Sequence, residues 1–282
     1  MRTNATSSRT LSVEAFVLAW PGNEKSAQCI QNEVRPCVDS VTVLYNSPTP
    51  LSDVKVPEGW IDLGGDAYFA AKFEHARQVA RSDVQIFIPA DCHVENWANL
   101  ISRCRSAFAQ STKLAIWAPH TAGTAWTPER TMLRKHSRST LSVTAVDSLI
   151  WALKGSFLKN LPDLDFSNNT FGWGIETAVA AEAHRSGKLI VLDTSLTYGH
   201  VRGSAYNANH AERGEIDFFR TLPGKNLEIV RRIQYIFTHR KQAETVPLKL
   251  ATSAKLSMQV LLLSLPKRVC VRRDYAIEEG SG

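Results

Sequence analysis

The chain has no long hydrophobic run, although 44% of its 282 residues are apolar. Its strongest late apolar stretch, residues 258–265, ends at Pro266. That is well short of the roughly 18 apolar residues that a spanning helix needs. The first ten residues have no apolar core and do not resemble a signal peptide. We therefore expect no transmembrane segment, and we expect residues 1–11 to be a flexible N-terminus.

Cysteine is scarce, and the five cysteines are odd in number with no CxxC spacing. This pattern argues against a zinc knuckle or a disulfide framework and favours a reducing cytoplasm. No G-x-G-x-x-G motif follows the first apolar run, which argues against a dinucleotide-dependent oxidoreductase. The net charge of +6 suits anionic ligands, nucleic acid or an acidic membrane surface without selecting one.

Short apolar runs alternate with amphipathic segments through the first 120 residues. The runs at 13–20, 41–45, 60–63, 84–88 and 113–117 predict strands, and helical spacing marks 24–38, 67–81 and 97–109. This order predicts an α/β fold with a mostly parallel central sheet flanked by helices. Ligands of such sheets bind beyond the carboxyl ends of the strands.

The second half changes character after a basic, loop-rich stretch at 118–138. Strands are expected within 141–153 and at 189–193, with a helix over 172–185. Three further helices, at 210–222, 227–242 and 255–265, predict a helical tail. We therefore divide the chain into a main domain over 12–206 and a helical, basic C-terminal extension over 207–282.

Three places in the sequence carry candidate chemistry. Asp91 closes the segment that begins with the apolar run at 84–88. A carboxylate at the end of a strand can hold a divalent cation, which in turn neutralises a diphosphate. The alternative is an Asp that caps the next helix. The Gly-Trp-Gly-Ile-Glu segment at 172–176 places Glu176 in a first helical turn. Glu176 is therefore a candidate base for an acceptor hydroxyl, or else it complements the helix dipole. Trp173 is a candidate to flank a sugar ring, or a core tryptophan. His200 is a candidate metal ligand, or a surface histidine.

The motifs occur in a characteristic order: Asn-Glu at 23–24, Gly-Gly-Asp at 64–66, the strand ending in Asp91, the segment at 172–176, and Tyr-Gly-His at 198–200. Over 13–206 this order resembles the family 2 type of glycosyltransferase with the GT-A fold. The resemblance implies a metal-dependent, inverting transfer of a sugar from a nucleotide-diphosphate sugar to an acceptor hydroxyl.

The resemblance also implies roles for individual residues. It implies that Asp91 and His200 hold Mn²⁺ or Mg²⁺, that Lys72 faces the diphosphate, and that Glu176 lies at the acidic catalytic motif. Nucleoside contacts are implied for Asn46 and Asp62. Two departures concern the same site: Pro89 replaces the first Asp of the Asp-x-Asp motif, and Phe73 replaces an Asn. A single acidic ligand beside a histidine favours Mn²⁺ over Mg²⁺.

Basic residues gather at 130–138, at 231–241 and at 267–273. They predict either a polyanion-binding surface or simply a solvated face. The acceptor is accordingly a glycan, a lipid or a nucleic acid, with a DNA-modifying enzyme as a minority option. The apolar face around 260–265 would dock on the main domain, on a second subunit in a homo-oligomer, or on a membrane surface. The alternative function is a non-catalytic nucleotide, glycan or nucleic-acid binding protein on a degenerate GT-A fold.

Overall fold

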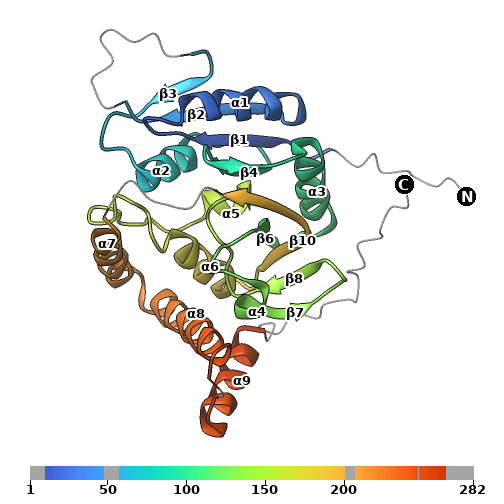
Figure 1. Ribbon diagram of the computed structural model, residues 1–282, viewed down its shortest axis with the longest axis vertical. Helices are drawn as coiled ribbons and strands as arrows, with labels where there is room; N and C mark the ends of the chain where they lie inside the picture. Colours follow the sequence, from blue (N-terminus) through green and yellow to red (C-terminus); the bar gives the residue numbers. More distant parts are fainter. Residues whose placement is uncertain (1–9, 48–56, 201–206, 247, 265–282) are drawn as a thin grey trace, which may run out of the picture.

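The computed structural model describes residues 10–47, 57–200, 207–246 and 248–264. A ten-stranded sheet forms the centre, with the strand order β3-β2-β1-β4-β9-β6-β10-β8-β7 and β5 paired with β10 (Figure 1). The fold is therefore mixed α/β, as predicted. The predicted main domain (12–206) would end with residues 201–206, which lie outside the described residues. The division into this domain and an extension over 207–282 therefore stays a prediction.

The first half builds a parallel sheet. The strands β1 (Val13–Leu18), β2 (Ser40–Tyr45), β3 (Trp60–Asp62) and β4 (Val84–Pro89) pair in parallel. The helix α1 (Glu24–Val34) and a 3-10 turn at Arg35–Cys37 connect β1 to β2, and α2 (Phe69–Val79) connects β3 to β4. The helix α3 (Trp97–Gln110) follows β4 and leads into the second half. On β1, Phe16 packs into one core while Val17 packs into the other. Both faces of β1 are covered, which explains its continuous apolar run.

The second half extends the sheet with mixed strands. β6 (Leu114–Thr121) and β10 (Leu189–His200) are parallel neighbours, and β9 (Trp151–Lys154) lies antiparallel between β4 and β6. β7 (Met132–Lys135) and β8 (Thr140–Val143) form the edge, and β5 (Cys92–His93) pairs with the end of β10. Because β9 runs antiparallel to both neighbours, β4, β6 and β10 all point the same way. Their carboxyl ends therefore share one edge of the sheet with those of β2 and β3.

The sequence predicted less order in two places than the structure contains. The stretch 118–138, expected to be loop-rich, contains α4 (Pro128–Thr131) and β7. These elements are only four residues long, too short for a periodic pattern. The strand predicted at 189–193 continues to His200 through an irregularity after Asp193. Residues 194–197 alternate between half-buried and exposed, and three of these four are polar, which weakens the apolar signal.

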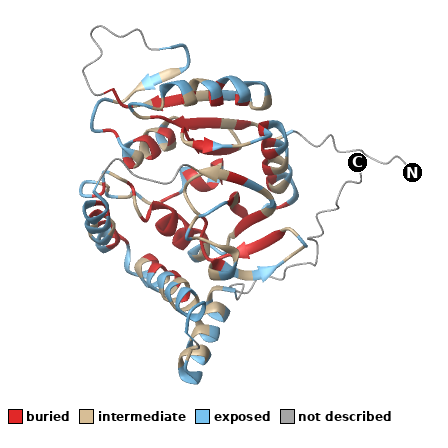
Figure 2. Ribbon diagram, viewed as in Figure 1, coloured by how far each residue is buried: buried red, intermediate tan, exposed pale blue. Residues whose placement is uncertain are grey.

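Helices cover both faces of the sheet (Figures 1 and 2). α1 and α3 pack on one face. The other face carries α2, α5 (Gly155–Lys159) and α6 (Ile175–Arg185), and it also receives α7 (Ala208–Thr221) and α8 (Gly224–Ala243). Phe218 and Ile233 are fully part of this core, so α7 and α8 are stabilised by the same apolar burial as the sheet.

The last described helix, α9 (Leu250–Ser264), contains no buried residue and lies against α8 and β7. Among the helices of the described part of the chain, none combines the length and apolar character that crossing a membrane requires.

Candidate functional site

Asp91 and His200 meet at the carboxyl edge of the sheet. Asp91 lies in the two-residue turn between β4 and β5, and His200 is the last residue of β10. The short strand β5 pairs with β10 so that Cys92 lies opposite His200. This pairing brings His200 Nε2 to 3.1 Å from Asp91 Oδ2, within hydrogen-bond reach across 109 positions of sequence. The hydrogen bond to Asp91 raises the pKa of the His200 imidazole, against the opposing effect of burial.

A second acidic residue, Asp147, lies at the same edge. It precedes β9, and because β9 is antiparallel, its amino end lies beside the carboxyl ends of β4 and β6. Thr124, in the loop after β6, donates a hydrogen bond to the Asp147 carboxylate. Burial raises the pKa of Asp147, while that hydrogen bond and then the charge of His200 act to lower it. The sequence shows that Asp147 lies near a strand end, but nothing in the local pattern indicates its partners, so Asp147 was not among the predicted site residues.

The Asp91–His200 pair has the chemistry of a partial cation site. Asp91 Oδ1 is buried and has no hydrogen-bond partner among the described residues, so this oxygen can accept a ligand. A carboxylate and an imidazole suit a borderline cation such as Mn²⁺. Within the described residues, no group of three or more His, Cys, Asp or Glu side chains is arranged to hold a metal. A cation bound here would therefore need further ligands from phosphate or water.

The predicted donor residues also converge. Lys72 Nζ donates a 2.6 Å hydrogen bond to Asn46 Oδ1 and lies 5.4 Å from the centre of the Trp20 ring. Asp62 Oδ1 accepts hydrogen bonds from the backbone N–H groups of Ser47 (3.0 Å) and Gly64 (2.8 Å). Asp62 thus shapes the loop that carries Asn46. Three predicted residues from two strands and α2 therefore form one cluster.

Lys72 is an unusual cation because only 1% of its surface is exposed. Burial lowers its pKa to about 7, and the charge of Asp62 opposes the shift. A buried ammonium lacks the hydration that it would have at the surface, so it gains strongly from an anion brought next to it.

The turn before α6 depends on two glycines in the left-handed region. Gly174 caps the helix at φ 81°, and a Cβ there would lie 2.6 Å from the Phe219 ring of α7. Gly172 has φ 76°, and a Cβ there would lie 2.7 Å from the Phe69 ring of α2. Both positions therefore require glycine, because the backbone is in the left-handed region and because a Cβ would be too close to a neighbouring ring. Trp173, between the glycines, is half-buried, and its carbonyl accepts a 2.8 Å hydrogen bond from Asn169 Nδ2.

Glu176 lies in the first turn of α6 and is only 8% exposed. Because α6 leads through a tight turn into β10, its amino end lies toward the carboxyl edge of the sheet. Burial, with smaller contributions from the charges of Glu215 and Asp147, raises the pKa of Glu176 to about 8 against the opposing hydrogen bonds. A carboxyl with a pKa near neutrality suits proton transfer. The charge of Asp147 thus acts on both Glu176 and His200.

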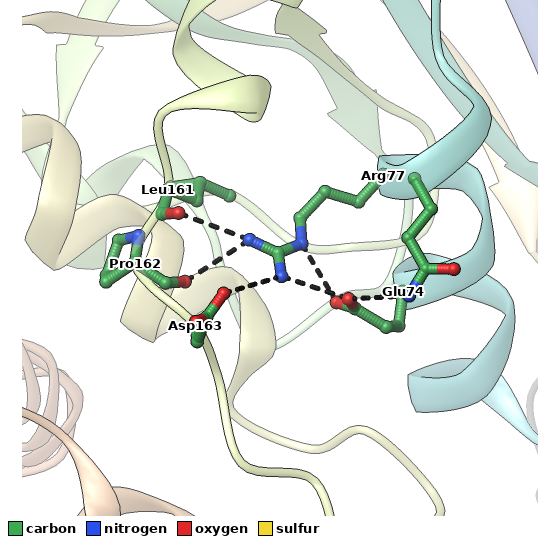
Figure 3. Close-up of polar contacts among 6 residues, drawn as sticks. Glu74, Arg77, Leu161, Pro162 and Asp163 are labelled. Atoms are coloured by element: carbon green, nitrogen blue, oxygen red, sulfur yellow. Dashed lines mark hydrogen bonds and ion pairs between the residues drawn. The ribbon is translucent and has the colours of Figure 1, made fainter.

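Arg77 fixes the chain that leads into this turn (Figure 3). From α2, its Nη1 donates to the carbonyls of Leu161 (3.2 Å) and Pro162 (3.4 Å). The guanidinium also pairs with Glu74 at 2.9 Å and with Asp163 at 3.3 Å. The same helix carries Lys72, so α2 supports both the donor cluster and the segment before the Gly-Trp-Gly turn. Sequence reasoning missed Arg77, because an arginine on an amphipathic helix resembles a solvated surface residue.

Comparison with protein-family models and with curated proteins finds no match. Solved structures do share the fold. The structure of GalNAc-T7 with UDP, GalNAc and Mn²⁺ aligns over 89% of this chain with a TM-score of 0.57 and 11% identity, and the chain spans 55% of that protein. The mannosyltransferase PcManGT from Pyrobaculum calidifontis, in complex with GDP-Man and Mn²⁺, aligns over 89% of this chain and 80% of its own, with a TM-score of 0.51 and 12% identity. A mycobacterial protein aligns over 82% and 74%, with a TM-score of 0.51 and 10% identity.

At these identities the likeness concerns the fold, and it confirms the predicted GT-A-type glycosyltransferase architecture. The similarity to family 2 in particular remains a prediction, as do the roles of the individual site residues.

Proposed function

We propose that this protein is a metal-dependent glycosyltransferase that uses a nucleotide-diphosphate sugar. The observation that carries the proposal is that the Asp91–His200 pair and the buried Glu176 lie at one sheet edge. Asp147 lies at the same edge, and its charge acts on both His200 and Glu176. The GT-A-type fold supports it, and two proteins that share this fold were solved with Mn²⁺ and UDP or GDP-Man. A fold hosts several functions, so the site must carry the argument for this chain.

The donor side of the site would be formed by Asn46, Asp62 and Lys72. The buried Lys72 ammonium would pair with a diphosphate oxygen and exchange its hydrogen bond to Asn46 for that ion pair. Asp91 and His200 would hold a divalent cation in place of their mutual hydrogen bond. Such a cation neutralises charge on the departing nucleotide diphosphate. Trp173 would flank the sugar or the acceptor.

Glu176 would act as the general base. The acceptor oxygen attacks the anomeric carbon, the bond from that carbon to the diphosphate oxygen breaks, and the hydroxyl proton passes to Glu176. Attack from the face opposite the leaving group inverts the anomeric carbon. The raised pKa makes the carboxylate a stronger base than an exposed glutamate, and about a tenth of it remains ionised at pH 7. The acceptor hydroxyl would belong to a glycan, a lipid or a modified DNA base.

A second candidate, a nucleotide-binding protein without turnover, is supported by one observation. The described residues offer no cluster of three metal-binding side chains. Turnover of a nucleotide sugar with Mn²⁺ separates the two candidates, since a binding protein would show a stability shift without hydrolysis or transfer.

The test begins with thermal shifts of the purified protein in nucleoside diphosphates and nucleotide sugars, with and without Mn²⁺. We expect one nucleotide to stabilise the wild type in a Mn²⁺-dependent way, and Asp91→Asn to lose that dependence. Glu176→Gln should keep the shift but lose transfer or donor hydrolysis by about 100-fold or more. Asp165→Asn, at an exposed position, serves as the control. Full turnover in both site variants would contradict the proposal.

A further inference from the structure

Helix α9 presents an apolar face that the described part of the protein leaves uncovered. Leu250, Met258 and Leu261 are 87%, 51% and 55% exposed, and Ala254 lies between them at helical spacing. The opposite face, with Leu256 and Val260 among others, is half-buried against α8 and β7. Figure 2 shows α9 in the tan and pale blue of half-buried and exposed residues. An exposed aliphatic stripe of this kind commonly marks an interaction surface.

Exposed basic residues lie on α9, directly before it and on the strand that it contacts. Lys249 and Lys255 belong to the α9 segment, and Lys255 Nζ lies 4.8 Å from the centre of the Tyr235 ring on α8. On β7, which contacts α9, Arg134 and Lys135 are both exposed. These cations come from sequence segments more than a hundred positions apart, and only the packing of α9 on β7 brings them together.

Acidic side chains are scarce around the same face. Residues 245–264 contain no Asp or Glu at all. Glu244, just before them, forms a bidentate ion pair with Arg130, in which Nε donates to Oε1 at 2.7 Å and Nη2 donates to Oε2 at 2.6 Å. Its charge is therefore already compensated. Within the part of the chain that the structure describes, Lys249, Lys255, Arg134 and Lys135 form no ion pair, so exposed aliphatic side chains and exposed cations occur together on α9 and β7.

We propose that α9 docks the protein on an anionic lipid surface. Leu250, Met258 and Leu261 would enter the boundary between headgroups and acyl chains, and the lysines and arginines around them would lie at the level of the lipid phosphates. A second copy of this chain fits less well, because a two-fold contact through α9 would bring the same cations together. Nucleic acid would pair with the cations but would leave the aliphatic stripe in water. This inference does not depend on the proposed enzymatic function.

The test is co-sedimentation of the full chain with phosphatidylcholine vesicles that contain or lack phosphatidylglycerol. We expect binding only to the anionic vesicles, with weaker binding as salt is raised. Met258→Ser/Leu261→Ser should lower the partition constant about tenfold or more. Arg134→Glu/Lys135→Glu should lower it by a similar factor. Ile216→Ser is the matched control, because it removes an equally exposed aliphatic side chain from α7 and should change nothing.

The variants are compared at equal helix content and melting temperature, so that unfolding does not imitate lost binding. Three outcomes would overturn the proposal: no binding to anionic vesicles, equal binding to neutral ones, or full binding by the Met258→Ser/Leu261→Ser variant. The proposal would also be overturned by a concentration-dependent dimer, in vesicle-free sedimentation, that this variant alone fails to form.

Discussion

Replacing Glu176 with glutamine should make the folded protein more stable at alkaline pH, although it removes the proposed base. Glu176 is 8% exposed, and burial is the main reason that its pKa rises from 4.5 to about 8. Glutamine has nearly the same shape and cannot ionise. The variant therefore keeps the packing of the first turn of α6 and loses only the ionisation.

The size of the effect follows from the two pKa values. A shift of one pKa unit corresponds to about 1.36 kcal/mol. The unfolded chain releases the proton above pH 4.5, whereas the folded protein holds it until about pH 8. Stability therefore falls as pH rises through this window. The loss is about 3 kcal/mol at roughly pH 7, and it levels off at about 5 kcal/mol above roughly pH 8.

Urea unfolding of both proteins at about pH 5, 7 and 9 would measure this difference. All other titrating groups are common to the two proteins and largely cancel in the comparison. We expect the free energies of unfolding to be similar at the lowest pH and the variant to gain stability steadily above it. A difference that stays constant across the three pH values would refute the assignment of a buried, proton-holding carboxyl at this position.

Three further perturbations test the supports of the site. Gly174→Ala should lower the free energy of unfolding by about 2–4 kcal/mol, because φ is positive and the new methyl group meets the Phe219 ring of α7. Gly187→Ala, at φ 65° in open space, should lower it by about 1 kcal/mol in the same urea titration. Arg77→Ala should lower the free energy of unfolding by about 2 kcal/mol through the lost carbonyl contacts, and Arg220→Ala, at an exposed ion pair, by less than about 0.5 kcal/mol. Lys72→Met should raise the melting temperature without ligand near about pH 6, because burial disfavours the ammonium, and it should abolish the shift caused by nucleoside diphosphates. An unchanged nucleotide shift in Lys72→Met would place the diphosphate elsewhere.

The sequence determined the elements whose signal is local. The apolar runs of β1 and β4 are unbroken because both faces of these strands are buried, so a short window was enough to predict central strands. The amphipathic spacing of α1 and α3 likewise reports a face that packs on the sheet. The sequence predicted Glu176 in the first turn of a helix, and the structure has it there, although the helix predicted over 172–185 begins at Ile175.

Only the tertiary structure decided which side chains meet. The contact between Asp91 and His200 depends on β5 pairing with the end of β10, a register that no local pattern encodes. Asp147 reaches the same edge because β9 is inserted antiparallel between two parallel strands. The environment of Glu176 depends on α7, whose Glu215 comes from the predicted extension. A short stretch of sequence indicates which residues of a strand or helix are buried. The pKa values and hydrogen bonds of the site instead depend on side chains from distant segments, which packing brings within a few ångströms.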